Sequence, residues 1–314
     1  MQVADARREK QKALIGLAGP SGSGKSLSAL LLAYGIVKEA HPDLPDEELW
    51  AKIGAADTEH KRLLNYVGQT HGNITIGSFK YIDFEPPFNT DRYTMAINLL
   101  MQQGVEVIIV DSLSHQWQGE GGVVETHGGM QGNSFQNWGK LAPESSKLVK
   151  GLTTAAVHMI TTLRVKSDYV IEQVDGKNVP KKVGMKPVQK DDMEYEFDTV
   201  FSIGMDHMAR VSKDITNLFE GDEFIITAEI GSKLYRYLEL GIDVQAEERA
   251  RREEEEANRL SNVAKIRELS STDAEVTKII TDCEFKANLQ LENMTIAMVD
   301  KIIKLIGGKL NVQN

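Results

Sequence analysis

A glycine-rich loop near the start of the chain constrains its fold more than any other feature. The loop reads G-x-x-x-x-G-K-S, and its residues are Gly19, Pro20, Ser21, Gly22, Ser23, Gly24, Lys25 and Ser26. An apolar run at 13–18 precedes it, and a segment at 27–37 rich in Leu and Ala follows it. We expect a buried strand, then the loop, then a helix, which is the context in which this motif binds phosphate groups.

Each residue type in this loop has a part in phosphate binding. Glycines allow backbone N–H groups to point inward at a phosphate, and the start of the following helix adds partial positive charge. The motif predicts that Lys25 reaches the β- and γ-phosphates of a nucleotide and that the Ser26 hydroxyl helps to hold Mg²⁺.

The composition limits the kind of protein that this chain can be. It has 314 residues, 41% of them apolar, which is enough for one large domain and a small one. The net charge is −10, so binding to DNA or RNA requires a locally basic segment. The single cysteine, Cys283, excludes an internal disulfide framework and fits a reducing compartment. Because residues 1–12 are polar and the next apolar run is short, we expect a cytoplasmic protein without a membrane segment.

Segments typical of strands and helices alternate from residue 13 to about 206. This alternation predicts an α/β fold, in which helices flank a largely parallel sheet, followed by a small helical module. The strand-like segments are 13–18, 52–57, 79–84, 105–110, 157–162 and 199–205, and 169–188 has the pattern of a hairpin. The helix-like segments are 27–37, 91–103, 141–151 and 227–240. Since 112–140 is rich in Gly, Gln and His, we expect a mobile loop there.

The chain changes character after Val244. Opposite charges recur four residues apart over 247–256, which is typical of an exposed helix. The pattern Thr272-x-x-Glu275 matches a capping box and predicts the start of another helix. We therefore divide the chain into residues 1–243 and residues 244–314. The second part either packs on the core or on itself, which we favour, or offers a docking site for a protein partner or a neighbouring subunit.

Two acidic residues follow predicted strands downstream of the loop. Asp111 ends the apolar run 107–110, where its carboxylate can complete a Mg²⁺ shell opposite Ser26. Glu59 lies just beyond the strand at 52–57, which we expect beside the strand of the phosphate loop. A carboxylate there can orient and polarise water for attack on a γ-phosphate. Equally, glutamate is common at the start of a helix, where the helix dipole favours it.

A basic segment follows the strand at 157–162. Thr161, Thr162 and Arg164 lie near the end of that strand, where polar groups can sense a γ-phosphate. Residues 166–190 carry six lysines against three acidic residues, in a chain that is acidic overall. A basic hairpin here could bind single-stranded DNA, and the candidate contacts are Lys166, Tyr169, Lys177, Lys181 and Lys182. The alternative is a solvated β-ribbon, on which exposed lysines are common.

Taken in order, these motifs resemble the core of a RecA-type ATPase. The resemblance is carried by Gly19 to Ser26, Asp57-Thr58-Glu59-His60, Val110-Asp111-Ser112 and Thr161-Thr162-Leu163-Arg164. The chain is similar in particular to compact RecA-like ATP-binding proteins of bacteriophages, often classed as AAA-type ATPases, some of which are single-strand annealing recombinases. The segments Met185–Gln189 and Glu194–Asp198 also resemble that group. The resemblance covers residues 13 to 241 and not the C-terminal part.

The resemblance implies a function and a set of site residues. The function is Mg²⁺-dependent ATP hydrolysis coupled to single-stranded DNA binding, in recombination or annealing, by a homo-oligomer with ATP near its subunit interfaces. The implied site residues are Glu59 as the water-activating carboxylate, Asp111 in the metal shell, a γ-phosphate sensor at Thr161 or Thr162, and a DNA-facing loop from Arg164 onward.

Two other functions remain open from the sequence. The first is an ATP-gated switch that does not hydrolyse ATP and recruits a protein partner, such as a single-strand-binding protein, through its C-terminal helices. The second is a small-molecule kinase. Such kinases usually carry an Arg-rich lid over the phosphates, whereas the candidate lid here is a Lys-rich hairpin.

Overall fold

The computed structural model describes residues 5–174, 177–219, 221 and 223–307, with no side chains described for 168–174, 177–184 and Gln245. The described chain divides into two compact units. The larger is Lys10–Gly241, and the smaller takes Ile242 onward together with the segment before Lys10.

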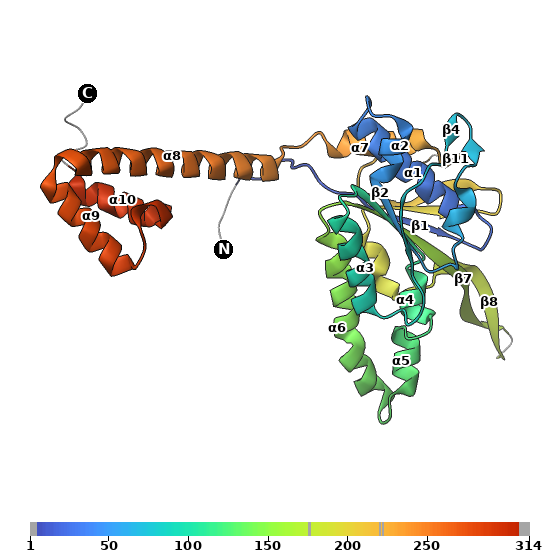
Figure 1. Ribbon diagram of the computed structural model, residues 1–314. Helices are drawn as coiled ribbons and strands as arrows, with labels where there is room; N and C mark the ends of the chain where they lie inside the picture. Colours follow the sequence, from blue (N-terminus) through green and yellow to red (C-terminus); the bar gives the residue numbers. More distant parts are fainter. Residues whose placement is uncertain (1–4, 175–176, 220, 222, 308–314) are drawn as a thin grey trace. The chain divides into compact units, whose positions relative to one another are not determined.

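The larger unit is built on a nine-stranded, mostly parallel sheet, so the predicted α/β class is confirmed (Figure 1). The strand order is β11-β10-β9-β1-β7-β6-β2-β5, and β8 pairs with β7. The parallel strands are β1 (Leu14–Gly19), β2 (Ile53–Asp57), β5 (Lys80–Asp83), β6 (Val107–Asp111), β7 (His158–Val174) and β9 (Thr199–Ile203). The antiparallel strands are β8 (Lys177–Pro187), β10 (Met208–Asp214) and β11 (Glu223–Ile225).

Helices cover both faces of this sheet (Figure 1). Their bounds are α1 (Lys25–Ala40), α2 (Asp46–Ala51), α3 (Thr90–Gln102), α4 (Ser114–Gln118), α5 (Val123–Gly129), α6 (Ser134–Thr153) and α7 (Ala228–Leu238). A separate two-stranded hairpin is formed by β3 (Thr70–His71) and β4 (Ile74–Thr75). Short 3-10 turns lie at Leu63–Tyr66 and Asp191–Glu196.

The alternation of side chains along each strand creates two apolar cores, one on each face of the sheet. Ile15 and Leu17 of β1 belong to the core that includes α1 and α7, whereas Leu14 and Ala18 belong to the core that includes α3 and α6. The same alternation holds along β6, because Ile109 joins the first core and the residues on either side of it join the second. Both faces of β1 and β6 are therefore buried, as the nearly continuous apolar runs in these strands require.

The strand order differs from one sequence-based expectation. β7 lies between β1 and β6, and β2 lies beyond β6. Contrary to our expectation, the strand before Glu59 is therefore not a direct neighbour of the phosphate-loop strand, and neither is the strand that ends at Asp111. Because β1, β7, β6 and β2 are all parallel, their carboxyl ends still meet at one edge of the sheet. Residues near these ends, including Glu59, Asp111 and Thr162, are thus brought together despite their separation in sequence.

The glycine-rich stretch at 112–140 is helical over much of its length, so the prediction of a mobile loop was wrong. It contains α4, α5 and the start of α6. The Asn133 side chain accepts a hydrogen bond from Gln136 N and caps α6, so this helix begins well before the predicted start at 141, and Pro143 lies inside it. Trp117 and Trp138 stack on each other with ring centroids 5.8 Å apart, so each ring packs against the other within this helical region.

The smaller unit has an apolar core of its own. It comprises α8 (Val244–Thr272), α9 (Ala274–Ala287), the short turn Leu291–Asn293 and α10 (Ile296–Ile306). The core residues on these elements include Ile266, Ile280 and Ile302, each at most 2% exposed. The cap of α9 is Asp273, whose carboxylate accepts from two backbone N–H groups of the first turn, so the expected capping box at Thr272 was wrong by one residue.

A substitution at the contact between α1 and α7 tests the close packing behind the phosphate loop. A Cβ atom added at Gly35 would lie 1.8 Å from the carbonyl oxygen of Ala228, so the two helices would have to separate. We expect Gly35→Ala to lower the free energy of unfolding by at least about 1–3 kcal/mol. The matched control is Gly128→Ala in α5, where the new methyl meets nothing within 4 Å. Urea unfolding of both variants decides, and equal stability of the two would contradict this packing.

The buried His158 predicts a loss of stability in acid. Burial and the charge of Lys12 lower the pKa of His158 to about 3, and its Nδ1 accepts a hydrogen bond from Ala13 N. Between pH 6.5 and 3 the unfolded chain therefore binds a proton that the folded chain does not, so stability falls as the pH falls. Between pH 7 and pH 5, this one group should lower the free energy of unfolding by about 2 kcal/mol. Urea titrations at the two pH values should show that this acid-dependent loss of stability disappears in His158→Asn. It should remain in His60→Asn, because His60 is exposed.

Candidate nucleotide site

The phosphate loop connects β1 to α1 and has the backbone that its glycines allow. Gly22 and Gly24 have φ values of +86° and +93°, which L side chains rarely adopt. The Nδ1 atom of His207, from the turn between β9 and β10, lies 3.1 Å from the carbonyl oxygen of Ser23. Because that oxygen is only an acceptor, the His207 proton must lie on Nδ1. The turn therefore supports the loop from the neighbouring strand.

Two polar side chains of the loop lack an anionic partner among the described residues. The Lys25 ammonium donates to the carbonyl oxygens of Gly19 and Pro20, at 2.8 Å each. Burial lowers the pKa of Lys25, although the nearby carboxylates of Asp111 and Glu59 oppose this effect. The Ser23 hydroxyl is fully buried and has no hydrogen-bond partner among the residues that the structure describes. Both groups would gain from an anion bound in the loop, since a buried polar group without a partner is costly.

Asp111 connects the loop to the strands beside it. Its Oδ2 accepts a hydrogen bond from the Ser26 hydroxyl at 2.5 Å, and its Oδ1 accepts one from the Thr162 hydroxyl. Burial raises the pKa of Asp111, and these two hydrogen bonds oppose the rise. A carboxylate between two hydroxyls is an oxygen-rich donor set of the kind that Mg²⁺ prefers. Thr161 is different, because its hydroxyl is buried and faces the Ile15 carbonyl oxygen of β1.

Glu59 lies just beyond the end of β2 and is held in a fixed orientation. Its carboxylate receives two hydrogen bonds from Arg164, Nε to Oε1 at 2.7 Å and Nη2 to Oε2 at 2.6 Å. Burial alone would raise the pKa of Glu59, but these bonds and the charge of Arg164 lower it. The buried carboxylate of Asp57 accepts hydrogen bonds from the backbone N–H groups of Glu59 and Leu63, which fixes the turn after β2.

A second set of hydrogen bonds ties this turn to the segment after Asp111. Thr58 N donates to the Asp111 carbonyl oxygen at 2.7 Å, and Ser112 N donates to the Thr58 hydroxyl at 2.8 Å. His115 of α4 lies 2.6 Å from the same hydroxyl through Nδ1 and stacks on Phe88. Burial and the charge of Arg164 lower the pKa of His115. The ends of β2 and β6 therefore form one connected polar layer.

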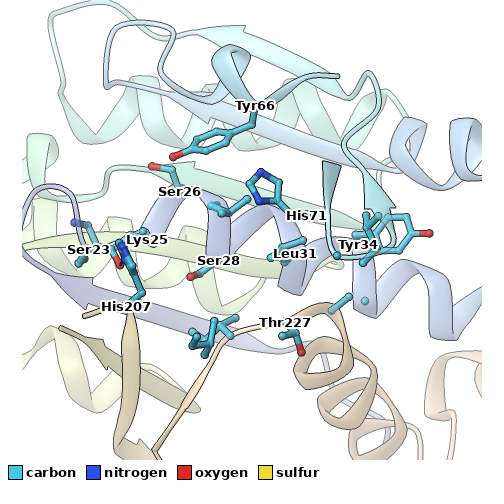
Figure 2. A pocket seen from close by; sticks show the side chains of 18 of the residues that line it. Ser23, Lys25, Ser26, Ser28, Leu31, Tyr34, Tyr66, His71, His207 and Thr227 are labelled. Atoms are coloured by element: carbon cyan, nitrogen blue, oxygen red, sulfur yellow. Dashed lines mark hydrogen bonds between the residues drawn. The ribbon is translucent and has the colours of Figure 1, made fainter. Parts of the chain in front are cut away.

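The loop, Asp111, Glu59 and Arg164 all border one cavity of about 1430 Å³. This volume exceeds the range of about 300–1,000 Å³ that is usual for small-molecule sites. The cavity extends from the phosphate loop along α1, and Figure 2 shows Tyr66 and His71 on one side of it and Thr227 on the other.

The far end of the cavity was not identified from the sequence. Its lining includes Leu31, Tyr34, His71, Ile226 and Thr227. These positions come from α1, the region between β2 and β4, and the segment just before α7, so no pattern in the sequence links them. Only the fold brings them to one surface.

The predicted basic hairpin is present as β7 and β8. The two strands pair antiparallel from Val165↔Pro187 to Val174↔Lys177, so they extend well beyond the edge of the sheet. Lys166 is exposed, and it pairs in register with Lys186, whose ammonium lies 3.6 Å from Asp191. The side chains of the other four candidate contacts lie outside the described part of the structure: Tyr169, Lys177, Lys181 and Lys182.

Comparisons with known proteins do not assign this site to a family. No protein-family model matches the chain, and no curated protein matches it significantly. Among the described residues, no helix has both the length and the apolar character needed to cross a bilayer. The same residues contain no group of three or more His, Cys, Asp and Glu side chains placed to hold a metal ion.

Proposed function

We propose that this chain is a Mg²⁺-dependent ATPase with a RecA-like core, and that it couples ATP to single-stranded DNA binding in recombination or annealing. The observation that carries the proposal is the contact of Ser26 and Thr162 with the buried Asp111, directly beside a complete phosphate loop. The two hydroxyls and the carboxylate come from three separate segments, which a chance match to the loop motif would not bring together.

Each residue near the loop has a part in this proposal. Backbone N–H groups of the loop and the Lys25 ammonium would bind the phosphates, with Lys25 leaving its two carbonyl partners. Ser26 and Asp111 would hold Mg²⁺, which neutralises phosphate charge when bound. Thr162 is better placed than Thr161 to respond to the terminal phosphate, since its hydroxyl contacts Asp111. Glu59 borders the same cavity and would orient the attacking water.

The far end of the cavity supports a nucleoside rather than a bare phosphate as the ligand. Apolar and aromatic side chains from α1, the region before β4 and the start of α7 line it. Such a surface suits a planar base, whereas inorganic phosphate would leave it solvated.

The DNA part of the proposal is supported by the hairpin of β7 and β8. It extends from the strand that carries Thr162 and Arg164, and its sequence is basic in an acidic chain. We propose that the protein works as a homo-oligomer. We also propose that the C-terminal unit offers a site for a replication or recombination protein, such as a single-strand-binding protein.

A second candidate function has one observation in its favour. Both oxygens of Glu59 are engaged by Arg164, which lowers the pKa of the carboxylate and leaves it fewer lone pairs with which to orient water. An ATP-gated switch that never hydrolyses its nucleotide would need no other state of Glu59.

Two substitutions test the nucleotide chemistry. Lys25→Ala removes a charge-assisted contact with the phosphates, so we expect the affinity for a fluorescent ATP analogue to fall about 10- to 100-fold. Glu59→Gln should keep that affinity and lower the rate of hydrolysis about 10²- to 10⁴-fold. The matched control for lysine is Lys80→Ala, at an exposed position of β5.

The outcomes separate the candidate functions. Turnover in the wild type that disappears in Glu59→Gln supports the ATPase. Tight binding without turnover, with or without DNA, supports the switch. Phosphoryl transfer to a small acceptor would instead show a kinase, and no binding at all would contradict every nucleotide function.

The hairpin can be tested through salt dependence. Replacing Lys166, Lys177, Lys181 and Lys182 by Ala should weaken binding to a fluorescent single-stranded oligonucleotide. The slope of log affinity against log salt should become shallower by about 0.7 for each phosphate that the variant no longer neutralises. The control replaces four exposed lysines of the smaller unit: Lys265, Lys278, Lys286 and Lys301. An equal change of slope in both variants would show that overall charge, and not the hairpin, determines binding.

A further inference from the structure

The pair of Glu59 and Arg164 has features that a surface ion pair lacks. The Glu59 side chain is only 6% exposed, and both of its oxygens accept from the same guanidinium. Arg62 is another nearby cation. Its Nη1 lies 3.6 Å from Glu59 Oε2 and its side chain is 52% exposed, so it holds the Glu59 carboxylate less firmly than Arg164 does. A planar guanidinium that engages a buried carboxylate through two bonds fixes its orientation as well as its charge.

Arg164 is also joined by its backbone to three parts of the structure. Its residue position pairs with Gly19, the last residue of β1, at the entrance to the phosphate loop. Its N–H donates to the hydroxyl of Ser114 at 2.9 Å, in the segment after Asp111. Its carbonyl oxygen accepts from Val188 N at 2.7 Å, where the hairpin returns to the core. A movement of the hairpin relative to the core therefore acts on Arg164 directly.

The Arg164 side chain borders the same cavity as Lys25 and Asp111. It is 47% exposed, so the guanidinium can leave Glu59 without crossing packed side chains. A triphosphate in the cavity would offer it a competing anion. The position is thus suited to two alternative partners, the carboxylate of Glu59 and a phosphate oxygen.

We propose that Arg164 is a positioning residue that holds Glu59 in an inactive orientation, and that single-stranded DNA on the β7–β8 hairpin favours opening of this pair. The inference rests on the proposed function, because it concerns the same hydrolytic site. It differs from the sequence-based role of Arg164 as a sensor, since here the residue restrains the carboxylate that would activate water. Hydrolysis without DNA should then be slow because the restraint is intact, and not because ATP is absent from the site.

Steady-state kinetics of the full chain test this restraint. Arg164→Gln removes the guanidinium, so we expect kcat without DNA to rise about 10- to 100-fold, as a charge-assisted contact no longer restrains Glu59. Stimulation by a single-stranded oligonucleotide should shrink by a similar factor. Arg164→Lys keeps the charge but not the two parallel bonds, so its DNA-free kcat should lie between wild type and Arg164→Gln.

Two controls show whether the effect passes through Glu59. Arg62→Gln removes a nearby cation that makes no bidentate contact with Glu59, and we expect little change in kcat. The double variant Glu59→Gln with Arg164→Gln should be as slow as Glu59→Gln alone. Thermal unfolding checks that each variant is folded, and Arg164→Lys serves if Arg164→Gln is not.

The results distinguish this inference from the proposed function. A DNA-stimulated wild type whose Arg164 variants show unchanged or lower DNA-free kcat would overturn the restraint and leave the ATPase intact. If wild type and both Arg164 variants bind the fluorescent ATP analogue but hydrolyse nothing, with or without DNA, both the restraint and the hydrolytic function are wrong. A rise in Arg62→Gln equal to that in Arg164→Gln would also overturn the restraint, since general charge would then suffice.

Discussion

The rest of the site depends on the hydrogen bonds that the buried carboxylate of Asp111 accepts. It lies at the end of β6 and accepts hydrogen bonds from Ser26 at the start of α1 and from Thr162 on β7. Burial makes its ionised form costly, and the two hydroxyls only partly offset that cost. Its surroundings therefore favour a bound cation, and the phosphate loop beside it favours a bound anion. A metal–phosphate pair satisfies both requirements at once.

The same logic applies to the charged residues farther from Asp111. Lys25 donates to two carbonyl oxygens, and Glu59 accepts from Arg164, so each has a partner in the chain itself. Such partners stabilise a polar cavity before a ligand binds, because a buried charge without a partner is costly. They are also the contacts that a bound triphosphate would have to replace. The arrival of a triphosphate would then cause several exchanges of partner in one event.

Much of this arrangement could be predicted from the sequence, because its strongest signals are local. The loop at Gly19–Ser26 and the apolar strands ending at Asp57 and Asp111 depend on short-range geometry, and the structure contains them. The position of β7 between β1 and β6 depends on long-range pairing, which periodicity does not report. The helical region after Asp111 was missed because Gly and Gln obscure the apolar pattern there. The pairing of Glu59 with Arg164 joins residues 105 apart in sequence, and no spacing rule indicates it.

A crystal structure with Mg²⁺ and a non-hydrolysable ATP analogue tests the central claim most directly. We expect phosphates against the backbone N–H groups of the loop and Mg²⁺ beside Ser26 and Asp111. We also expect the Lys25 ammonium to have moved from the carbonyl oxygens of Gly19 and Pro20 to a phosphate. An analogue bound elsewhere, with Lys25 still on those two oxygens, would contradict the claim.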